Sequence, residues 1–157
     1  IYKKQGKHKQ REINLLKAIE LDELESMYHI ELAELYLEYN EEEKCLHNYK
    51  KAYELDPETP EVILDYAQAL HHFEHTDLAI KKLEAHLSKE DDDYRFFYRL
   101  ASYLYCIGLV DKAEYLLHEA LTLRADEYPL LYAFAPFTEH MENVTNIIDL
   151  YLHKSND

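Results

Sequence analysis

Three histidines lie close together in the sequence HHFEH at residues 71–75. Their spacing is the one in this chain that best suits metal binding. His71 and His75 stand four residues apart, so on a helix their imidazoles would meet on one face and could share a metal ion. The cluster lies where a helix is expected to end, however, and no further cysteine or carboxylate is fixed beside it. We favour the alternative of an exposed polar helix end and predict no metal site and no cofactor.

The remaining reactive side chains do not form a catalytic pattern. Cys45 and Cys106 are far apart in sequence and form no CxxC pair, and two cysteines are too few for a disulfide framework. Cys45 is expected to be a small core residue, and no basic partner can be assigned to Cys106. The sequence contains no Gly-rich phosphate loop, nucleophile elbow or HExxH motif. We therefore predict a protein that is not an enzyme and has no catalytic residues.

The elements that position these residues are clearest between residues 94 and 127. Apolar residues recur there at helical spacing in two blocks, and Gly108 followed by Asp111 lies between the blocks. This pattern predicts a helix, a tight turn and a second helix. The other glycine, Gly6, lies 102 residues earlier, which is three times 34. A unit of this size cannot bury its apolar stripes alone, so similar neighbours are expected.

A 34-residue period extends over the whole chain. It predicts a single domain, residues 1–157, made of a partial repeat at 1–25, full repeats at 26–59, 60–93 and 94–127, and a degenerate capping repeat at 128–157. The partial repeat is expected to hold the end of a first helix, a turn at Gly6 and a complete second helix, which suggests that the natural chain extends further. Pro136 is expected to kink or end the first helix of the last repeat, and a final helix is predicted near residues 141–153.

Charge narrows the class of partner. The 157 residues carry 17 Lys+Arg against 32 Asp+Glu, a net charge of −15. Nucleic acid is disfavoured because neutralising phosphates needs a Lys/Arg stripe, and anionic membrane surfaces are disfavoured for the same reason. No apolar run is long enough to span a bilayer. The small number of cysteines favours a reducing compartment, and we predict a cytoplasmic protein.

At this point the residues resemble the tetratricopeptide repeat family, whose unit is a 34-residue helix-turn-helix. The resemblance covers essentially the whole chain and rests on first-helix, turn, second-helix and closing positions, which are Leu32, Ala33, Tyr36, Leu100, Ala101 and Leu104; Gly6 and Gly108; Cys45, Ala52, Ala113 and Ala120; and Pro57. It implies an all-α fold of antiparallel helix-turn-helix repeats stacked into a right-handed superhelix. It also implies a scaffold that binds a peptide or protein in a concave groove lined by the first helices.

By the family's pattern, the groove would run from an acidic end to an aromatic and basic end. The residues that we assign to it are Glu31, Glu34, Glu38, Asp65, Gln68, Arg95, Tyr98, Arg99, Ser102 and Tyr105. Family members that bind a C-terminal carboxylate have amide donors where this chain has Glu34 and Asp65, so we reject that mode. A ligand with a basic segment and an apolar or aromatic anchor fits better, although the charges could equally be a solvated inner face.

Two other interpretations stay open. The chain could be a self-associating repeat module whose terminal helices, or exposed half-repeat, pair with a second copy. The short basic run Lys3, Lys4, Lys7, Lys9 and Arg11 could dock the acidic groove of another copy or bind an acidic partner. Such a run is more often a solvated turn and helix start.

Overall fold

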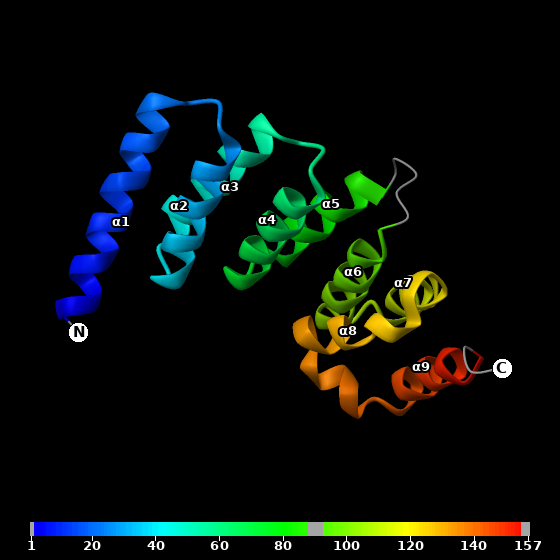
Figure 1. Ribbon diagram of the computed structural model, residues 1–157. Helices are drawn as coiled ribbons and strands as arrows, with labels where there is room; N and C mark the ends of the chain where they lie inside the picture. Colours follow the sequence, from blue (N-terminus) through cyan, green and yellow to red (C-terminus); the bar gives the residue numbers. More distant parts are fainter. Residues whose placement is uncertain (1, 88–92, 155–157) are drawn as a thin grey trace. The chain divides into compact units, whose positions relative to one another are not determined.

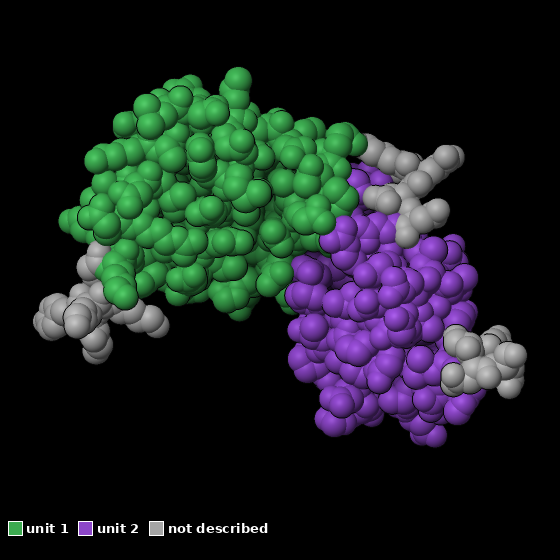
Figure 2. All heavy atoms as spheres, in the orientation of Figure 1, with its two compact units in different colours: residues 1–75 green, residues 76–157 purple. Residues whose placement is uncertain are grey.

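The computed structural model describes residues 2–87 and 93–154, and these residues are almost entirely helical. They form two compact units, Ile1–His75 and Thr76–Asp157 (Figures 1 and 2). The division falls between the two helices of the 60–93 repeat. The prediction that the whole chain is one domain therefore stays a prediction, and each unit is described by itself.

Unit 1 is a row of four helices in which each packs on the next (Figure 1). Its helices are α1 (Tyr2–Leu21), α2 (Ser26–Glu38), α3 (Glu42–Leu55) and α4 (Pro60–His72). The pair α2 and α3 fills the 26–59 repeat and packs through the predicted apolar stripes. Leu32, Ala33 and Tyr36 on α2 are buried, as are Cys45 and Ala52 on α3.

Unit 2 is built around the pair α6 and α7, which fills the 94–127 repeat. Its elements are α5 (Thr76–Leu87), α6 (Tyr94–Cys106), α7 (Val110–Arg124), the 3₁₀ turn η1 (Ala125–Glu127), α8 (Pro129–Phe134), the 3₁₀ turn η2 (Pro136–His140) and α9 (Glu142–Lys154). Both α5 and α8 pack on α6, and α9 packs on α7. None of the described helices is both long and apolar enough to cross a membrane.

Three helices end in the same hydrogen-bonded turn, known as a Schellman motif. After α2, the amide N–H of Glu41 donates to the carbonyl of Tyr36 (2.9 Å) and that of Asn40 donates to Leu37 (3.0 Å). The same two bonds recur 34 and 68 residues later, at the ends of α4 and α6. The residue in the left-handed conformation is Asn40 (φ 57°), Glu74 (φ 65°) or Gly108 (φ 78°). The predicted period is therefore confirmed at the level of the backbone.

The first repeat differs from the prediction. The period predicted a turn at Gly6, but α1 runs without a break from Tyr2 to Leu21. This prediction of a turn is wrong, and the reason is energetic: glycine inside a helix costs only about 1 kcal/mol, so a glycine alone does not break one. The partial repeat consists of one long second-type helix.

The helix boundaries predicted between residues 128 and 154 match the structure. Helix α8 is only six residues long and ends at Phe134, before Pro136, which cannot continue a helix. Helix α9 begins and ends within one residue of the predicted bounds. The first helix of this repeat is therefore shorter than its counterparts α2, α4 and α6.

One cluster of polar side chains joins the first three helices of unit 1. The Tyr36 hydroxyl on α2 donates a hydrogen bond to Glu12 Oε1 on α1 (2.8 Å). Lys44 on α3 lies 3.8 Å from the same carboxylate and 4.9 Å from the centre of the Tyr36 ring. This cluster links α1 to the complete repeat that follows it.

Candidate functional site

Four carboxylates form an acidic surface on unit 1. Glu31, Glu34 and Glu38 follow one another at helical spacing along α2, and Asp65 extends the group from α4. Glu34 and Glu38 are exposed, and Glu31 and Asp65 are half-buried. Hereafter these four residues are called the acidic surface.

The pKa of Glu34 reflects its partial burial and the repulsion from the neighbouring carboxylates. Partial burial, followed by the negative charges of Asp65, Glu31 and Glu38, raises the pKa of Glu34, and only the nearby Arg11 guanidinium opposes these effects. A cation placed over Glu34 would relieve this repulsion. The acidic surface is therefore suited to a positively charged ligand.

The groove role of the five residues predicted on unit 1 stays a prediction, and their exposure is compatible with it. The opposite side of α2 carries the buried residues Leu32, Ala33 and Tyr36, so Glu31, Glu34 and Glu38 are on the face left for solvent. Gln68 is exposed on α4, one turn after Asp65. All five residues predicted for this part of the groove are at least partly accessible.

Three residues predicted for the groove in unit 2 are buried instead. Tyr98 is 0% exposed, and its hydroxyl donates a hydrogen bond to the Arg124 carbonyl (2.8 Å). Ser102 is also 0% exposed, and its hydroxyl lies 2.7 Å from the Tyr98 carbonyl and 3.2 Å from the Leu131 carbonyl. Tyr105 is 4% exposed, and its hydroxyl has no hydrogen-bond partner among the described residues.

These three side chains are packing residues because α8 and the end of α7 cover this part of α6. A signal in the sequence could have identified Tyr98. Its counterparts at 34-residue spacing are Ile30 and Leu64, both apolar and both buried. Position 98 therefore belongs to a buried side of the first helix rather than to an open surface.

The two predicted groove arginines are half-buried and engaged within unit 2. Arg95 forms an ion pair with Asp93, which also caps the start of α6 (Nη2 to Oδ2, 2.5 Å). The Arg99 guanidinium lies 3.4 Å from the centre of the Phe134 ring on α8. Both cations hold local structure, so a ligand would have to compete with these contacts.

The histidines that first suggested metal chemistry connect successive turns of unit 1. His72 Nε2 lies 3.2 Å from Asn40 Oδ1, and His75 Nε2 lies 2.8 Å from Glu42 Oε1. Among the described residues, no three His, Cys, Asp or Glu side chains are grouped to hold a metal ion. The hydrogen bonds of His72 and His75 give these residues a structural role.

The two cysteines differ in accessibility. Cys45 is completely buried between α2 and α3, and burial raises the pKa of its thiol to about 12. Cys106 is exposed at the end of α6, with its Sγ 3.8 Å from the Phe134 carbonyl. Neither thiol has a basic partner in these contacts that would favour a reactive thiolate.

Comparison with known proteins identifies the fold. No protein-family model matches the sequence, and no curated protein matches it significantly. Among solved structures, a crystal structure of MamA is similar over 98% of this chain and 92% of its own, with 15% identity and a TM-score of 0.70. YrrB, described as a TPR protein with an unusual peptide-binding site, is similar over 99% of this chain and 81% of its own, with 16% identity and a TM-score of 0.65. At these identities the likeness shows the fold.

Proposed function

Because this chain has the tetratricopeptide-repeat fold, we propose that it is a non-enzymatic scaffold that binds a partner peptide or protein through its first helices. The observation that carries the proposal is the acidic surface on α2 and α4, where Glu34 has a raised pKa. The description of YrrB as having a peptide-binding site supports the same class of function.

The chemistry of the acidic surface selects the partner. Four carboxylates repel one another and attract Lys or Arg, so the bound segment is basic. Such charges mainly set the association rate and the choice of partner, while affinity also needs an apolar anchor. The buried positions of Tyr98 and Tyr105 remove them from this role.

The test uses fluorescent peptides that carry zero, two or four Lys residues around a single Leu. We expect binding to the full chain to strengthen with each pair of lysines and to weaken in high salt. The variant Glu34→Gln/Asp65→Asn should weaken binding of the four-lysine peptide by about five- to tenfold, because it removes two of the four charges.

A matched control keeps the net charge of that variant but leaves the acidic surface intact. Glu23→Gln/Glu43→Gln changes two exposed carboxylates, in the turn before α2 and at the start of α3. This control should bind as the wild type does. Equal weakening in the two variants would show that only the overall charge matters, and the proposed surface would be rejected.

Self-association through the terminal helices is a second candidate. Leu16 on α1 is 43% exposed and Leu150 on α9 is 59% exposed, which leaves apolar area on both helices. Light scattering over a range of concentrations tests it. A mass that rises with concentration, and that falls in Leu16→Lys or Leu150→Lys, would favour this candidate, whereas a constant monomer mass would dismiss it.

A further inference from the structure

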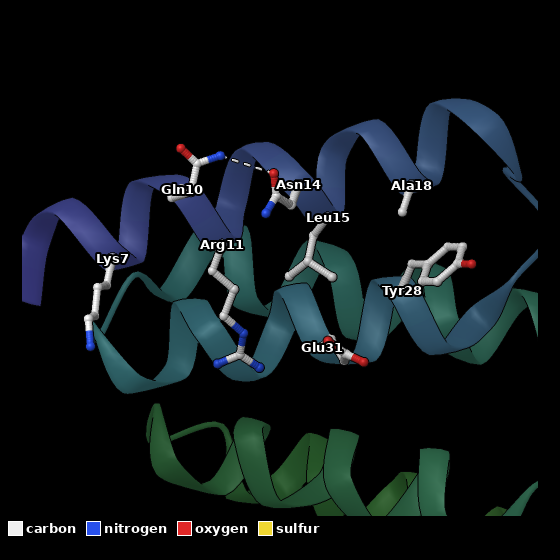
Figure 3. A pocket seen from close by; sticks show the side chains of 8 residues that line it. All are labelled: Lys7, Gln10, Arg11, Asn14, Leu15, Ala18, Tyr28 and Glu31. Atoms are coloured by element: carbon white, nitrogen blue, oxygen red, sulfur yellow. Dashed lines mark hydrogen bonds between the residues drawn. The ribbon is translucent and has the colours of Figure 1, made fainter.

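A cation of α1 reaches the acidic surface of unit 1. The side chain of Arg11 points from α1 toward α2, and it lines a hollow of about 470 Å³ between these two helices (Figure 3). Arg11 Nη1 lies 3.5 Å from Oε1 of Glu38, the last residue of α2. Glu31 of the acidic surface lines the same hollow. Helix α1 thus contributes a positive charge to the end of the acidic surface.

The Arg11 guanidinium acts on two carboxylates that lie one helical turn apart. Burial and the negative charge of Asp65 raise the pKa of Glu34, whereas the positive charge of Arg11 lowers it. Glu34 and Glu38 are four residues apart on α2, so their side chains are neighbours on one face. A single guanidinium therefore relieves part of the repulsion between them.

The positive charge at this position is specific to α1. Arg11 precedes Cys45 by one 34-residue period, and Ala79 and Ala113 stand at the next two corresponding positions. These three residues are small, uncharged and completely buried. Position 11 thus departs from the period in both size and charge, and its charge is opposite to that of the carboxylates that it reaches.

Helix α1 is held on α2 by contacts other than this ion pair. Leu15 points toward α2 and is 8% exposed, and Glu12 accepts a hydrogen bond from the Tyr36 hydroxyl (2.8 Å) (Figure 3). The side chains of Arg11 and Glu38 are 40% and 60% exposed, and ion pairs at such exposure contribute little to stability. Arg11 can therefore leave Glu38 at a low cost in free energy while α1 stays in place.

We propose that Arg11 occupies, in the free protein, the position that an arginine of the bound segment takes in the complex, and that Arg11 therefore competes with the ligand. This competition, which rests on the proposed function, defines both the side chain that the acidic surface prefers and the residue that limits its affinity. Glu34 and Glu38 form the arginine subsite, because they are the carboxylates on which Arg11 acts.

The geometry of a guanidinium favours arginine over lysine at this subsite. The planar group presents donors along two edges, so it can face two carboxylates at once. The ammonium group of lysine is a compact and more strongly hydrated point charge. Because Glu34 and Glu38 are one turn apart, one arginine can engage both, and the acidic surface selects segments that contain arginine.

The test compares two fluorescent peptides with a single Leu, one with four Arg residues around it and the other with four Lys residues. Their binding to the full chain is measured by anisotropy at low salt. We expect the arginine peptide to bind the wild type several-fold more tightly than the lysine peptide. Arg11→Gln should strengthen binding of both peptides by about three- to fivefold, because it removes the competing cation.

Lys17→Gln is the matched control, because it removes an exposed positive charge from the same helix and gives the same net charge as Arg11→Gln. This control should strengthen binding much less. Glu38→Gln removes the ion-pair partner of Arg11, so Arg11→Gln should have a smaller effect in that background, and the preference for the arginine peptide should decrease. Without any peptide, an NMR titration should show a higher pKa of Glu34 in Arg11→Gln and no change in Lys17→Gln.

The results distinguish the competition by Arg11 from the proposed function. If neither peptide binds the wild type, both are rejected. If the peptides bind but Arg11→Gln and Lys17→Gln have equal effects, or if Arg11→Gln weakens binding, the acidic surface is retained and the competition by Arg11 is rejected. Equal affinity of the wild type for the two peptides would reject the arginine subsite.

Discussion

Asn40 and Glu74 stand one 34-residue period apart and adopt the same left-handed backbone conformation, with φ of 57° and 65°. Each ends a first helix, and each donates its N–H to the carbonyl three residues before it. Asn tolerates this conformation, but a glutamate side chain has no such advantage. Glu74 therefore holds backbone strain that the third turn avoids by using Gly108.

Replacing Glu74 with glycine should stabilise the protein. The left-handed conformation costs a non-glycine residue roughly 1–2 kcal/mol, and the greater freedom of glycine in the unfolded chain offsets part of this gain. We expect Glu74→Gly to raise the free energy of unfolding by up to about 1 kcal/mol, measured by urea denaturation.

Two controls frame this prediction. His47→Gly, at an exposed position within α3, should lower stability by about 1 kcal/mol. Gly108→Ala should also lower stability by about 1 kcal/mol, through backbone strain alone, because no atom lies within 4 Å of the added Cβ. A loss of stability in Glu74→Gly would contradict the strain that we assign to that turn.

Tyr98 should prove to be a stability residue. Tyr98→Phe removes the hydrogen bond to the Arg124 carbonyl and should cost about 1 kcal/mol. Tyr98→Ala leaves a cavity at a completely buried position and should cost roughly 3–5 kcal/mol. The thermal midpoint and near-ultraviolet circular dichroism measure both effects. If Tyr98→Ala were as stable as the wild type, Tyr98 would again be a candidate for partner binding.

The stability of the protein should depend on pH through the carboxyl group of Glu34. Burial and then Asp65 raise the pKa of Glu34, so the folded protein holds the Glu34 proton more tightly than the unfolded chain does. The corresponding stability is complete below the unfolded pKa and is lost as the pH rises through the folded one. Glu34→Gln should therefore stabilise the protein slightly at neutral pH and not at low pH.

The same titration affects ligand binding. The affinity for a four-lysine peptide should increase as the pH rises through the pKa of Glu34, since the charged carboxylate attracts the lysines. Glu34→Gln should flatten this part of the pH profile, and Glu43→Gln should not. An unchanged profile in Glu34→Gln would assign the titration to another group.

The two thiols should react at very different rates. Cys106 is exposed, whereas Cys45 is completely buried and burial raises its pKa to about 12. A brief treatment of the native protein with iodoacetamide should modify Cys106 alone, and both cysteines should react in urea, as measured by mass spectrometry. Fast modification of native Cys45 would mean that α2 and α3 separate readily.

Much of the fold could be predicted from the sequence because the 34-residue period recurs along most of the chain. Apolar residues at helical spacing predicted the pairs α2 with α3 and α6 with α7, and Pro136 predicted the end of α8. Gly6 was misleading, because a glycine permits a turn but does not require one. A turn is predicted reliably only where a helical pattern lies on both sides of the turn residue.

The candidate surface was less predictable. Glu34 and Gln68 are exposed on unit 1, but their counterpart Ser102 is completely buried under the contact with α8. Residues at the same place in the period are thus accessible or covered according to what packs beside them. That difference arises from the packing of α8 on α6, which the period alone does not describe.

The three identical turns also restrict how the length of this chain can vary. Successive residues of an α-helix are rotated by about 100°, so one residue inserted between α2 and α3 would turn the buried side of α3 away from α2. Tyr49 and Ala52 would leave the interior, and charged neighbours would take their places. The segment between α3 and α4, which contains Pro57, has no such turn, and insertions and deletions should be tolerated more readily there than at residues 39–41.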